Sequence, residues 1–303
     1  MTDPVDRRSV RCALALAAAA PSVHNSQPWR WVVGRHMLHL YADLGRWLPT
    51  TDPHGRDMIV SCGAALHHAR VALAAAGLAS SVRRMPVLDE PDHLASLKLH
   101  PRPADDTALT LAAAILRRRT DRRPFTDWEV PAAFVDELTD RATGQGALLR
   151  PVTTTWSRAR LIDVMRAADG QQVDVLGKRA IVARRLADVG APARRFGDIE
   201  QSPNGQPDGA VLMVLATASD DALSHLRAGE ALSAVSLHAT ELGLATCALS
   251  EPFEAGSARH VVQDEVLDGC AVPQLLLRVG WAPAGTPVRP TPRRQVDDMI
   301  EPF

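Results

Sequence analysis

The sequence of 303 residues is short of cysteine, of net charge and of long apolar runs. Its four cysteines (Cys12, Cys62, Cys247 and Cys270) stand far apart with no C-x-x-C pair, which argues against a disulfide framework and a cysteine zinc site. The formal net charge of −1 argues against nucleic acid or a membrane surface as the main partner. No run approaches the roughly 18 apolar residues that a membrane span needs. We therefore expect a protein of the reducing cytoplasm.

The familiar catalytic signatures are missing as well. The sequence has no G-x-S-x-G, no P-loop, no H-E-x-x-H and no Rossmann G-x-G-x-x-G followed by an acid. His67 and His68 are neighbours on a predicted helix, so their side chains diverge by about 100° and cannot chelate one metal ion. We expect these two histidines to be solvated or to cap the helix, and we expect no metal site.

The alanine-rich run before Ala20 follows Arg7 and Arg8 and resembles a short signal peptide. The run is short, Ser9 and Arg11 separate it from the basic pair, and similar alanine-rich segments recur inside the chain. We interpret it as a helix over residues 7–20 that delivers the next stretch.

That next stretch, Ala20 to Trp31 (APSVHNSQPWRW), is the most informative part of the sequence. It places hydroxyl, carboxamide, imidazole and indole groups around two prolines seven residues apart, which forbid a regular helix across the segment. The polar groups suit a rim that reads the polar edge of a planar ligand. The alternative is a turn capped by Ser22 and Asn25, with the two tryptophans entering the core.

The rest of the chain shows alternating helical and strand-like patterns. We predict a hairpin, further strands and further helices. The loop from Asp43 to Arg56 is expected to form ion pairs through Asp43, Arg46, Asp52 and Arg56. The predicted strands are Trp31–Val33, Leu38–Tyr41, Val82–Leu88, Ser96–His100, Leu148–Val152, Val211–Thr217 and Pro273–Trp281, and the predicted helices cover 58–76, 105–119 and 157–187.

One helical segment is repeated. Residues 63–79 begin with Gly-Ala-Ala-Leu and end with Gly-Leu-Ala, and residues 229–245 begin with Gly-Glu-Ala-Leu and end in the same way. A chance match in an alanine-rich chain is one reading. The preserved spacing, with a strand after each copy, favours an internal duplication.

An arginine-rich element, residues 117–123 (RRRTDRR), follows the predicted third helix. Such a run is commonly a solvated face. It also suits a phosphate clamp, because guanidinium groups meet phosphate oxygens bidentately and Thr120 adds a hydroxyl donor.

These motifs together resemble the nitroreductase-type FMN flavoproteins, and most narrowly their mycobacterial Acg subgroup. Residues 21–29 resemble the Pro-Ser-x-x-Asn-x-Gln-Pro-Trp signature, and residues 118–122 resemble Arg-x-Ser-x-Arg with threonine in the serine place. The resemblance implies an α+β, nitroreductase-like fold, internally duplicated so that one chain resembles a dimer. The halves would be 1–103 and 104–303, with a lid over 178–209.

The resemblance also implies the contacts to FMN. The first half lacks a properly spaced arginine element and the second lacks a Pro-Ser-x-x-Asn element, so these complementary losses leave one FMN site per chain. Catalytic side chains are not implied, because FMN carries the chemistry. The implied cofactor-binding residues are Ser22, Val23, Asn25, Gln27, Arg118, Thr120, Arg122, Leu249, Ser250, Glu251 and Arg293.

The function implied by the resemblance is hydride transfer from NAD(P)H through FMN to a nitro or quinone-like acceptor. The scarcity of lysine, with no candidate near flavin N1, favours an alternative in which the protein stores or sequesters FMN with little turnover. A structural protein without flavin is a third reading. The expected partners are small molecules. Because the dimer-like unit is fused, we expect a monomer, with further dimerisation as the alternative.

Overall fold

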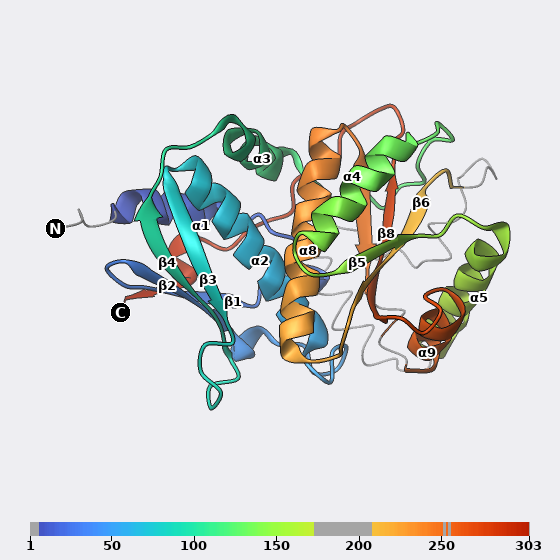
Figure 1. The fold of residues 1–303 in the computed structure, drawn as a ribbon, viewed down its shortest axis with the longest axis horizontal. Helices are drawn as coiled ribbons and strands as arrows, with labels where there is room; N and C mark the ends of the chain where they lie inside the picture. The colour runs from blue at the N-terminus through green and yellow to red at the C-terminus, as the bar shows by residue number, and fades with distance from the viewer. Residues whose placement is uncertain (1–5, 173–207, 251–252, 254–255, 303) are drawn as a thin grey trace. The chain divides into compact units, whose positions relative to one another are not determined.

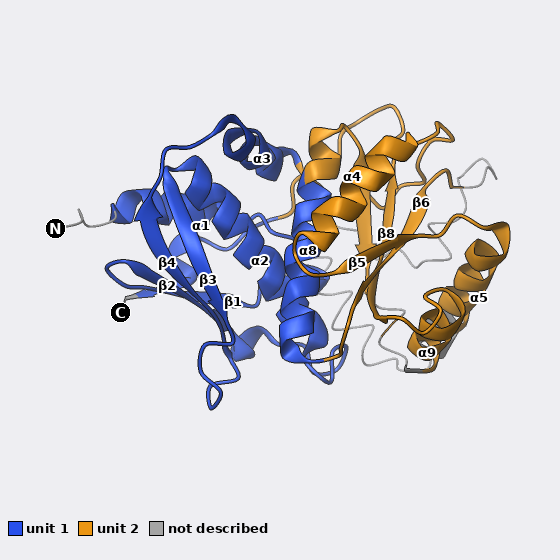
Figure 2. Ribbon diagram, in the orientation of Figure 1, with its two compact units in different colours: residues 1–117, 221–237, 292–303 blue, residues 118–220, 238–291 orange. Residues whose placement is uncertain are grey.

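The structure, a computed structural model, describes residues 6–172, 208–250, 253 and 256–302, where helices and strands alternate (Figure 1). The chain divides into two compact units (Figure 2). Unit 1 comprises residues 1–117, 221–237 and 292–303, and unit 2 comprises residues 118–220 and 238–291. The mixed helix and sheet content agrees with the predicted α+β class.

Unit 1 is built on a sheet with the strand order β3-β4-β2-β1-β9. Its strands are β1 (Trp29–Val33), β2 (Met37–Ala42), β3 (Leu78–Arg84), β4 (His93–Pro101) and β9 (Ile300–Pro302). The pair β1–β9 is parallel and the other neighbouring pairs are antiparallel. The predicted β1–β2 hairpin is confirmed, with Trp31 paired to Leu40.

The helices of unit 1 cover the apolar face of this sheet (Figure 1). Because side chains alternate along a strand, Trp31, Leu38, Leu40 and Leu97 share that face and are completely buried. Strand β3 begins earlier than the predicted Val82, because α2 ends just before a left-handed glycine that leads straight into the strand. The helices are α1 (Arg7–Ala17), α2 (Arg56–Ala75), α3 (Asp106–Arg117) and the unit-1 part of α8 (Ala222–Glu241).

Helices α2 and α8 meet at two glycines, one on each helix. A Cβ added at Gly63 would lie 2.1 Å from the Leu226 carbonyl oxygen, and one added at Gly229 would lie 1.9 Å from the Val60 carbonyl oxygen. These two contacts mirror each other, so the helices cross backbone to backbone with local twofold symmetry. Any side chain at either position would force the helices apart.

The prediction that His67 and His68 are solvated is wrong. Their exposed fractions are 8% and 0%, and the Nδ1 atom of each lies 2.7 Å from the Ser233 hydroxyl oxygen. Burial lowers the pKa of His67 to about 3, so its imidazole is neutral. Helical spacing alone had suggested solvent, but the partner hydroxyl comes from α8, far away in the sequence.

A buried carboxylate lies in the same seam between the helices. Glu230 on α8 is 0% exposed and accepts hydrogen bonds from Arg70 at 2.8 Å and from Arg84 at 2.6 Å. A buried carboxylate needs such charged partners, because the loss of its hydration is otherwise strongly unfavourable. The seam therefore joins α2, α8 and strand β3.

Unit 2 is built on an antiparallel sheet with the strand order β5-β6-β8-β7. The predicted buried strand over Val211–Thr217 is confirmed as β6, in the interior of this sheet. Helices α4 and α9 were not predicted from the sequence. The elements are α4 (Ala132–Thr143), β5 (Leu148–Pro151), α5 (Thr155–Gln172), β6, β7 (Ala245–Leu249), α9 (Gly256–Glu265) and β8 (Val272–Gly280).

A buried ion pair joins strand β8 to the residues just before β6. The Arg278 guanidinium is 0% exposed and donates to Asp208 Oδ2 at 2.6 Å, while Asp208 Oδ1 accepts from the Phe125 amide at 2.7 Å. Asp208 and Gly209 are the described end of the predicted lid over 178–209. Residues 178–207 lie outside the described residues.

The compact units differ in their bounds from the predicted halves 1–103 and 104–303. Residues 106–117 form α3, which packs against α2 in unit 1. Residues 221–237 join unit 1 through the glycine crossing, and the last strand, β9, joins it by pairing with β1. The difference arises because two segments late in the sequence find their partners near its beginning.

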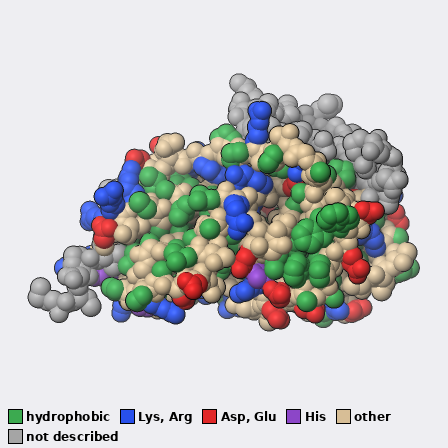
Figure 3. Space-filling view, turned by 90° about the horizontal axis from the view of Figure 1, so that it is seen from above, with side chains coloured by type: hydrophobic (Ala, Val, Ile, Leu, Met, Phe, Trp, Pro, Cys, Tyr) green, Lys and Arg blue, Asp and Glu red, His purple; other side chains and the backbone are tan. Residues whose placement is uncertain are grey.

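Exposed charges of both signs lie among apolar side chains on the face shown in Figure 3, which fits the small net charge. Among the described residues, α2 alone is long and apolar enough to cross a membrane. Of that stretch 78% is buried inside the protein, as in the core helix of a folded domain.

We predict that Gly229→Ala lowers the stability of the protein, because the new Cβ would overlap the Val60 carbonyl oxygen. Overpacking of this kind costs about 1–3 kcal/mol. The measurement is the urea midpoint followed by circular dichroism. Gly144→Ala is the matched control, since its Cβ would meet nothing nearer than 3.4 Å and its φ is −60°. An unchanged midpoint for Gly229→Ala would contradict the close crossing.

Candidate functional site

The polar stretch between α1 and β1 has an unusual backbone. It passes through a short 3₁₀ turn at Val23–Asn25, and the φ angles of His24, Asn25 and Gln27 are 45°, 53° and 50°. Non-glycine residues rarely adopt positive φ, and such residues gather at functional sites where the surroundings hold the strain. The expectation that this segment leaves helical geometry is confirmed.

Local hydrogen bonds hold the first part of this loop. The Ser22 hydroxyl oxygen accepts from the Gln27 amide at 3.1 Å, and the Val23 amide donates to the Ser61 hydroxyl on α2 at 3.1 Å. The Ser61 hydroxyl in turn donates to the Asp57 carbonyl at 2.6 Å. The loop is therefore fixed to the central helix of unit 1.

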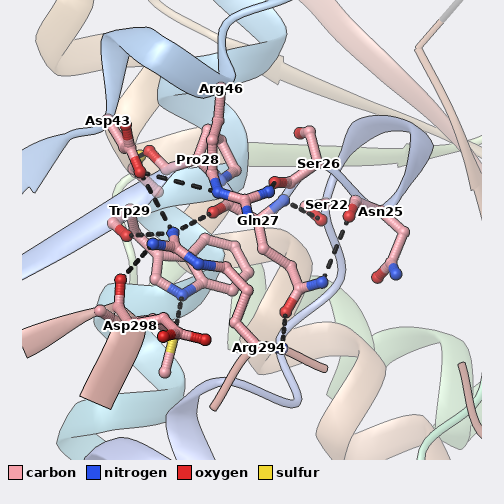
Figure 4. Close-up of polar contacts among 12 residues, drawn as sticks. Ser22, Asn25, Ser26, Gln27, Pro28, Trp29, Asp43, Arg46, Arg294 and Asp298 are labelled. Atoms are coloured by element: carbon pink, nitrogen blue, oxygen red, sulfur yellow. Dashed lines mark hydrogen bonds and ion pairs between the residues drawn. The ribbon is translucent and has the colours of Figure 1, made fainter. Parts of the chain in front are cut away.

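The C-terminal segment of the chain holds the second part of the loop (Figure 4). Asn25 Oδ1 accepts from Arg293 at 2.6 Å, and Asn25 Nδ2 donates to the Pro292 carbonyl at 3.0 Å. Gln27 Oε1 accepts from the Arg294 amide at 2.8 Å. The side chains of Ser22, Asn25 and Gln27 thus take part in fixing the backbone of the loop.

Arg294, which we had not placed in the site, is the centre of this arrangement (Figure 4). Its Nη1 donates to the carbonyls of Gln27 and Trp29, each at 3.0 Å, and its Nη2 donates to the Asp298 carbonyl. Burial lowers the pKa of Arg294, and the nearby Arg46 lowers it further. The guanidinium thus joins the loop, the first strand and the C-terminal segment.

Two residues of the loop Asp43 to Arg56 also reach the stretch. Asp43 Oδ2 lies 3.3 Å from Arg294 Nη1 and 3.7 Å from Arg46 Nε, and Arg46 donates to the Ser26 carbonyl at 3.1 Å. The predicted ion pairs are present for Asp43 with Arg46, while Arg56 pairs with Asp57 at 2.9 Å. Asp52 instead accepts from the Met58 amide at the start of α2.

The arginine element lies in unit 2 from Arg118 onward and runs beside strand β7. Thr120 forms a parallel bridge with Thr246, and the Asp121 amide donates to the Thr246 carbonyl at 2.9 Å. Arg118 is 5% exposed, whereas a solvated face would leave it in water. Asp121 takes Arg123 in an ion pair at 2.6 Å. Thr120 therefore lies at the edge of β7, with Arg118 two residues before it and Arg122 two residues after it.

The other unit-2 residues that the resemblance implies begin at the end of strand β7. Leu249 ends the strand and is buried, Ser250 follows it, and Glu251 lies outside the described residues. Burial raises the pKa of Cys247 on the same strand, while Arg278 and Arg122 oppose that rise. The structure therefore places the arginine element beside the beginning of β7, at Thr246, three residues before the strand ends at Leu249.

The remaining predicted residues lie in unit 1. Ser22, Val23, Asn25 and Gln27 share the strained loop, and Arg293 contacts Asn25 and the Ala19 carbonyl. The contacts of Arg294 depend on the pairing of β9 with β1, which the local sequence pattern did not indicate. Within the described part of the chain, no group of three or more His, Cys, Asp or Glu side chains is placed to hold a metal ion.

The sequence and the structure were compared with those of known proteins. A search of protein-family models found no match. A protein of Mycobacterium tuberculosis (strain H37Rv) named "Putative NAD(P)H nitroreductase" is 41% identical over 323 residues, covering 98% of this chain and 92% of its own length. The nitroreductase Acg of the same strain, also named as putative, is 35% identical over 317 residues, covering 96% of this chain and 95% of its own length.

A solved structure also matches part of the chain. It is the FMN-dependent nitroreductase NfnB of Mycobacterium smegmatis in complex with NADPH, at 19% identity and a TM-score of 0.46 over 64% of this chain and 97% of that one. The two curated relatives match almost from end to end at identities well above chance. The chain therefore belongs to the nitroreductase family, in the group that includes the mycobacterial protein Acg.

Proposed function

We propose that this protein is an FMN-dependent oxidoreductase that transfers hydride from NAD(P)H through FMN to a nitro or quinone-like acceptor. The relatives named as NAD(P)H nitroreductases support the general role. The observation that carries the proposal is the bridge between Thr120 and Thr246, because it sets the arginine element beside strand β7, whose end at Leu249 is expected at the flavin.

The residues present fit FMN by the chemistry of their donors. A phosphate group of about −1.5 to −2 charge requires cations and hydroxyl donors, which Arg118, Arg122 and Thr120 supply. The pyrimidine edge requires both donors and acceptors, which the carboxamides of Asn25 and Gln27 and the hydroxyl of Ser22 supply. Bound FMN would supply the hydride chemistry itself.

The protein itself would position the bound flavin and polarise its ring system. The backbone at Leu249 and Ser250 would present polar groups to one edge of the flavin, and Val23 would add apolar contact. Arg293 is proposed as a further phosphate contact. For that role its guanidinium would exchange its present bonds to Asn25 and the Ala19 carbonyl for bonds to the ligand.

A second function is an FMN-storing or sequestering protein with little turnover. The specific observation in its favour is the scarcity of lysine side chains that could lie near flavin N1. The sequence has two lysines, Lys98 and Lys178. Lys98 lies on strand β4 of unit 1 with its side chain exposed, and Lys178 lies outside the described residues. Steady NAD(P)H consumption with an acceptor supports catalysis, whereas FMN that binds but resists NAD(P)H supports storage.

We also propose that the chain is internally duplicated. The bounds of α2 and α8 coincide when the sequence is shifted by the 166 residues that separate His67 from Ser233. Gly63 and Gly229 are related by the same shift, and both helices end before a glycine of positive φ, Gly77 or Gly243. The fused pair would make the chain a monomer of the cytoplasm that resembles a nitroreductase dimer.

We predict a stoichiometry of one FMN per chain, because each half lacks one of the two binding elements. Equilibrium titration of the ligand-free protein, followed by flavin fluorescence, measures the saturation point. Saturation at two FMN per chain would show that the degenerate elements still bind.

We predict that Arg118→Ala weakens FMN by roughly ten- to a hundredfold, because a charge-assisted hydrogen bond contributes about 1.5–3 kcal/mol. Riboflavin lacks the phosphate, so its affinity should hardly change. Arg117→Ala is the matched control, since Arg117 is an exposed neighbour outside the implied clamp. If Arg118→Ala weakened FMN and riboflavin equally, the arginine element would not hold the phosphate.

We predict that Asn25→Gly and Asn25→Ala reduce the FMN-induced rise in melting temperature to the same degree, because both remove the carboxamide. FMN at a concentration of 100 Kd should raise the free energy of unfolding of the wild-type protein by about 2.7 kcal/mol. The ligand-free melting temperatures should differ, since Asn25 has φ 53° and alanine there adds about 1–2 kcal/mol of strain that glycine avoids. If FMN raised the melting temperature of Asn25→Gly as much as that of the wild type, the carboxamide would have a purely structural role.

A further inference from the structure

The face of the unit-1 sheet opposite α1 and α2 carries a row of polar side chains. The register pairs His39 on β2 with Ser96 on β4, and Ser96 with Arg83 on β3. Since directly paired residues point to the same face, these three side chains lie side by side. Lys98 follows Ser96 on that face two residues later.

His93 joins the row through a local irregularity in the strands. The register shifts between Leu40 and Tyr41, so that Tyr41 is paired with His93. A bulge of this kind re-aims a side chain, and here it turns the imidazole toward Ser96. Tyr41 stacks on the His93 ring with 4.3 Å between centroids and 15° between planes, which holds the imidazole in place.

Ser96 contacts both imidazoles at hydrogen-bonding distance. Its Oγ lies 3.1 Å from His93 Nε2 and 2.9 Å from His39 Nδ1. On the far side of the ring, His93 Nδ1 lies 3.5 Å from Glu90 Oε2. In one proton arrangement, His39 Nδ1 donates to Ser96 Oγ, and Ser96 donates to His93 Nε2, which also lies 3.1 Å from His39 Nδ1. The Nδ1 proton of His93 then faces Glu90 in an ion-pair contact without a hydrogen bond.

A cavity of about 370 Å³ opens beside Ser96. Ser96 contributes to its lining, together with the cationic Arg83 and Lys98 and the apolar Met37, Val82 and Pro86. Ser96 and the two cations thus line one cavity, while the base lies beside Ser96 and the carboxylate lies behind the base. A nucleophile with a neighbouring base that a third group orients is an arrangement that acyl transfer uses.

We propose that Ser96 is the nucleophile of a second active site that hydrolyses small carboxylic esters. Ser96 Oγ bonds to the ester carbonyl carbon while His93 Nε2 takes the hydroxyl proton. The tetrahedral oxyanion faces Arg83 and Lys98, and it collapses as the alcohol leaves with the proton from His93. Water, deprotonated by His93, then releases the carboxylic acid and restores Ser96. Glu90 and His39 are positioning residues.

The charges around His93 suit a general base. Burial lowers its pKa below the ordinary 6.5, the nearby His39 lowers it further, and Glu90 and Asp92 oppose the change. A base acts in its neutral form, so activity should rise with pH through this pKa and reach its plateau by neutral pH. The groups that face His93 are His39 and Tyr41 from β2, Glu90 and Asp92 from the β3–β4 loop, and Ser96 from its own strand; Arg30 of β1 lies over Tyr41.

The test uses the full chain with FMN present. The probes are a fluorophosphonate, which labels activated serines covalently, and p-nitrophenyl acetate. Mass spectrometry of the labelled peptides should place the modification on Ser96. Ser96→Ala should abolish labelling and lower hydrolysis by at least about a hundredfold, because general-base activation contributes roughly 10²–10⁴. Glu90→Gln should slow hydrolysis about tenfold and lower the pH of half-maximal activity, because the Glu90 carboxylate raises the pKa of His93.

Ser80→Ala is the matched control, because Ser80 lies on β3 but is paired with the buried Leu99 on the opposite face. It should keep wild-type labelling and hydrolysis. Unchanged circular dichroism and FMN binding show that each variant is folded, and they keep this test separate from the flavin function. Absence of labelling, labelling of another serine, or wild-type hydrolysis by Ser96→Ala or Glu90→Gln would overturn the proposal.

Discussion

The backbone contact of α2 with α8 at Gly63 and Gly229 is the constraint on which unit 1 depends. Two helices this close leave no room for large side chains between them, so the seam is filled by small residues and by polar groups that bond across it. Ser233 lies between two buried imidazoles, and Glu230 is held by two arginines. These buried groups tolerate no sliding of one helix along the other, because each would lose its partner away from water.

The same helix fixes the strained loop. Ser61 on α2 accepts from the Val23 amide, and the C-terminal segment holds Asn25 and Gln27 from the other side. Side chains expected to read a ligand therefore also hold the backbone that presents them. The two roles compete most directly at Arg293, whose guanidinium bonds Asn25. If Arg293 binds the phosphate as proposed, it would release Asn25 Oδ1 at the same moment, and ligand affinity would be coupled to loop stability through one side chain.

Sequence alone predicted the features that depend on local pattern. The hairpin, the buried strand Val211–Thr217 and the glycine-terminated helices follow from alternation, apolar runs and left-handed glycines. It failed where partners are distant in the sequence. The burial of His67 and His68 depends on Ser233, and the role of Arg294 depends on the pairing of β9 with β1. No local signal carries those pairings.

The candidate site shows the same division. The residue types at positions 21–29 and 118–122 predicted the two FMN-binding elements, but they did not predict the contacts that hold those elements in place. The cluster around Ser96 was missed because no motif describes it: Glu90, His93 and Ser96 are close in sequence, yet His93 reaches Ser96 only through the bulge, and His39 arrives from another strand by register. A one-residue slip of β2 against β4 would turn the row to the other face. A site of this kind is encoded by strand pairing, and the rigid sheet holds its groups in place without the backbone strain that the loop at Asn25 requires.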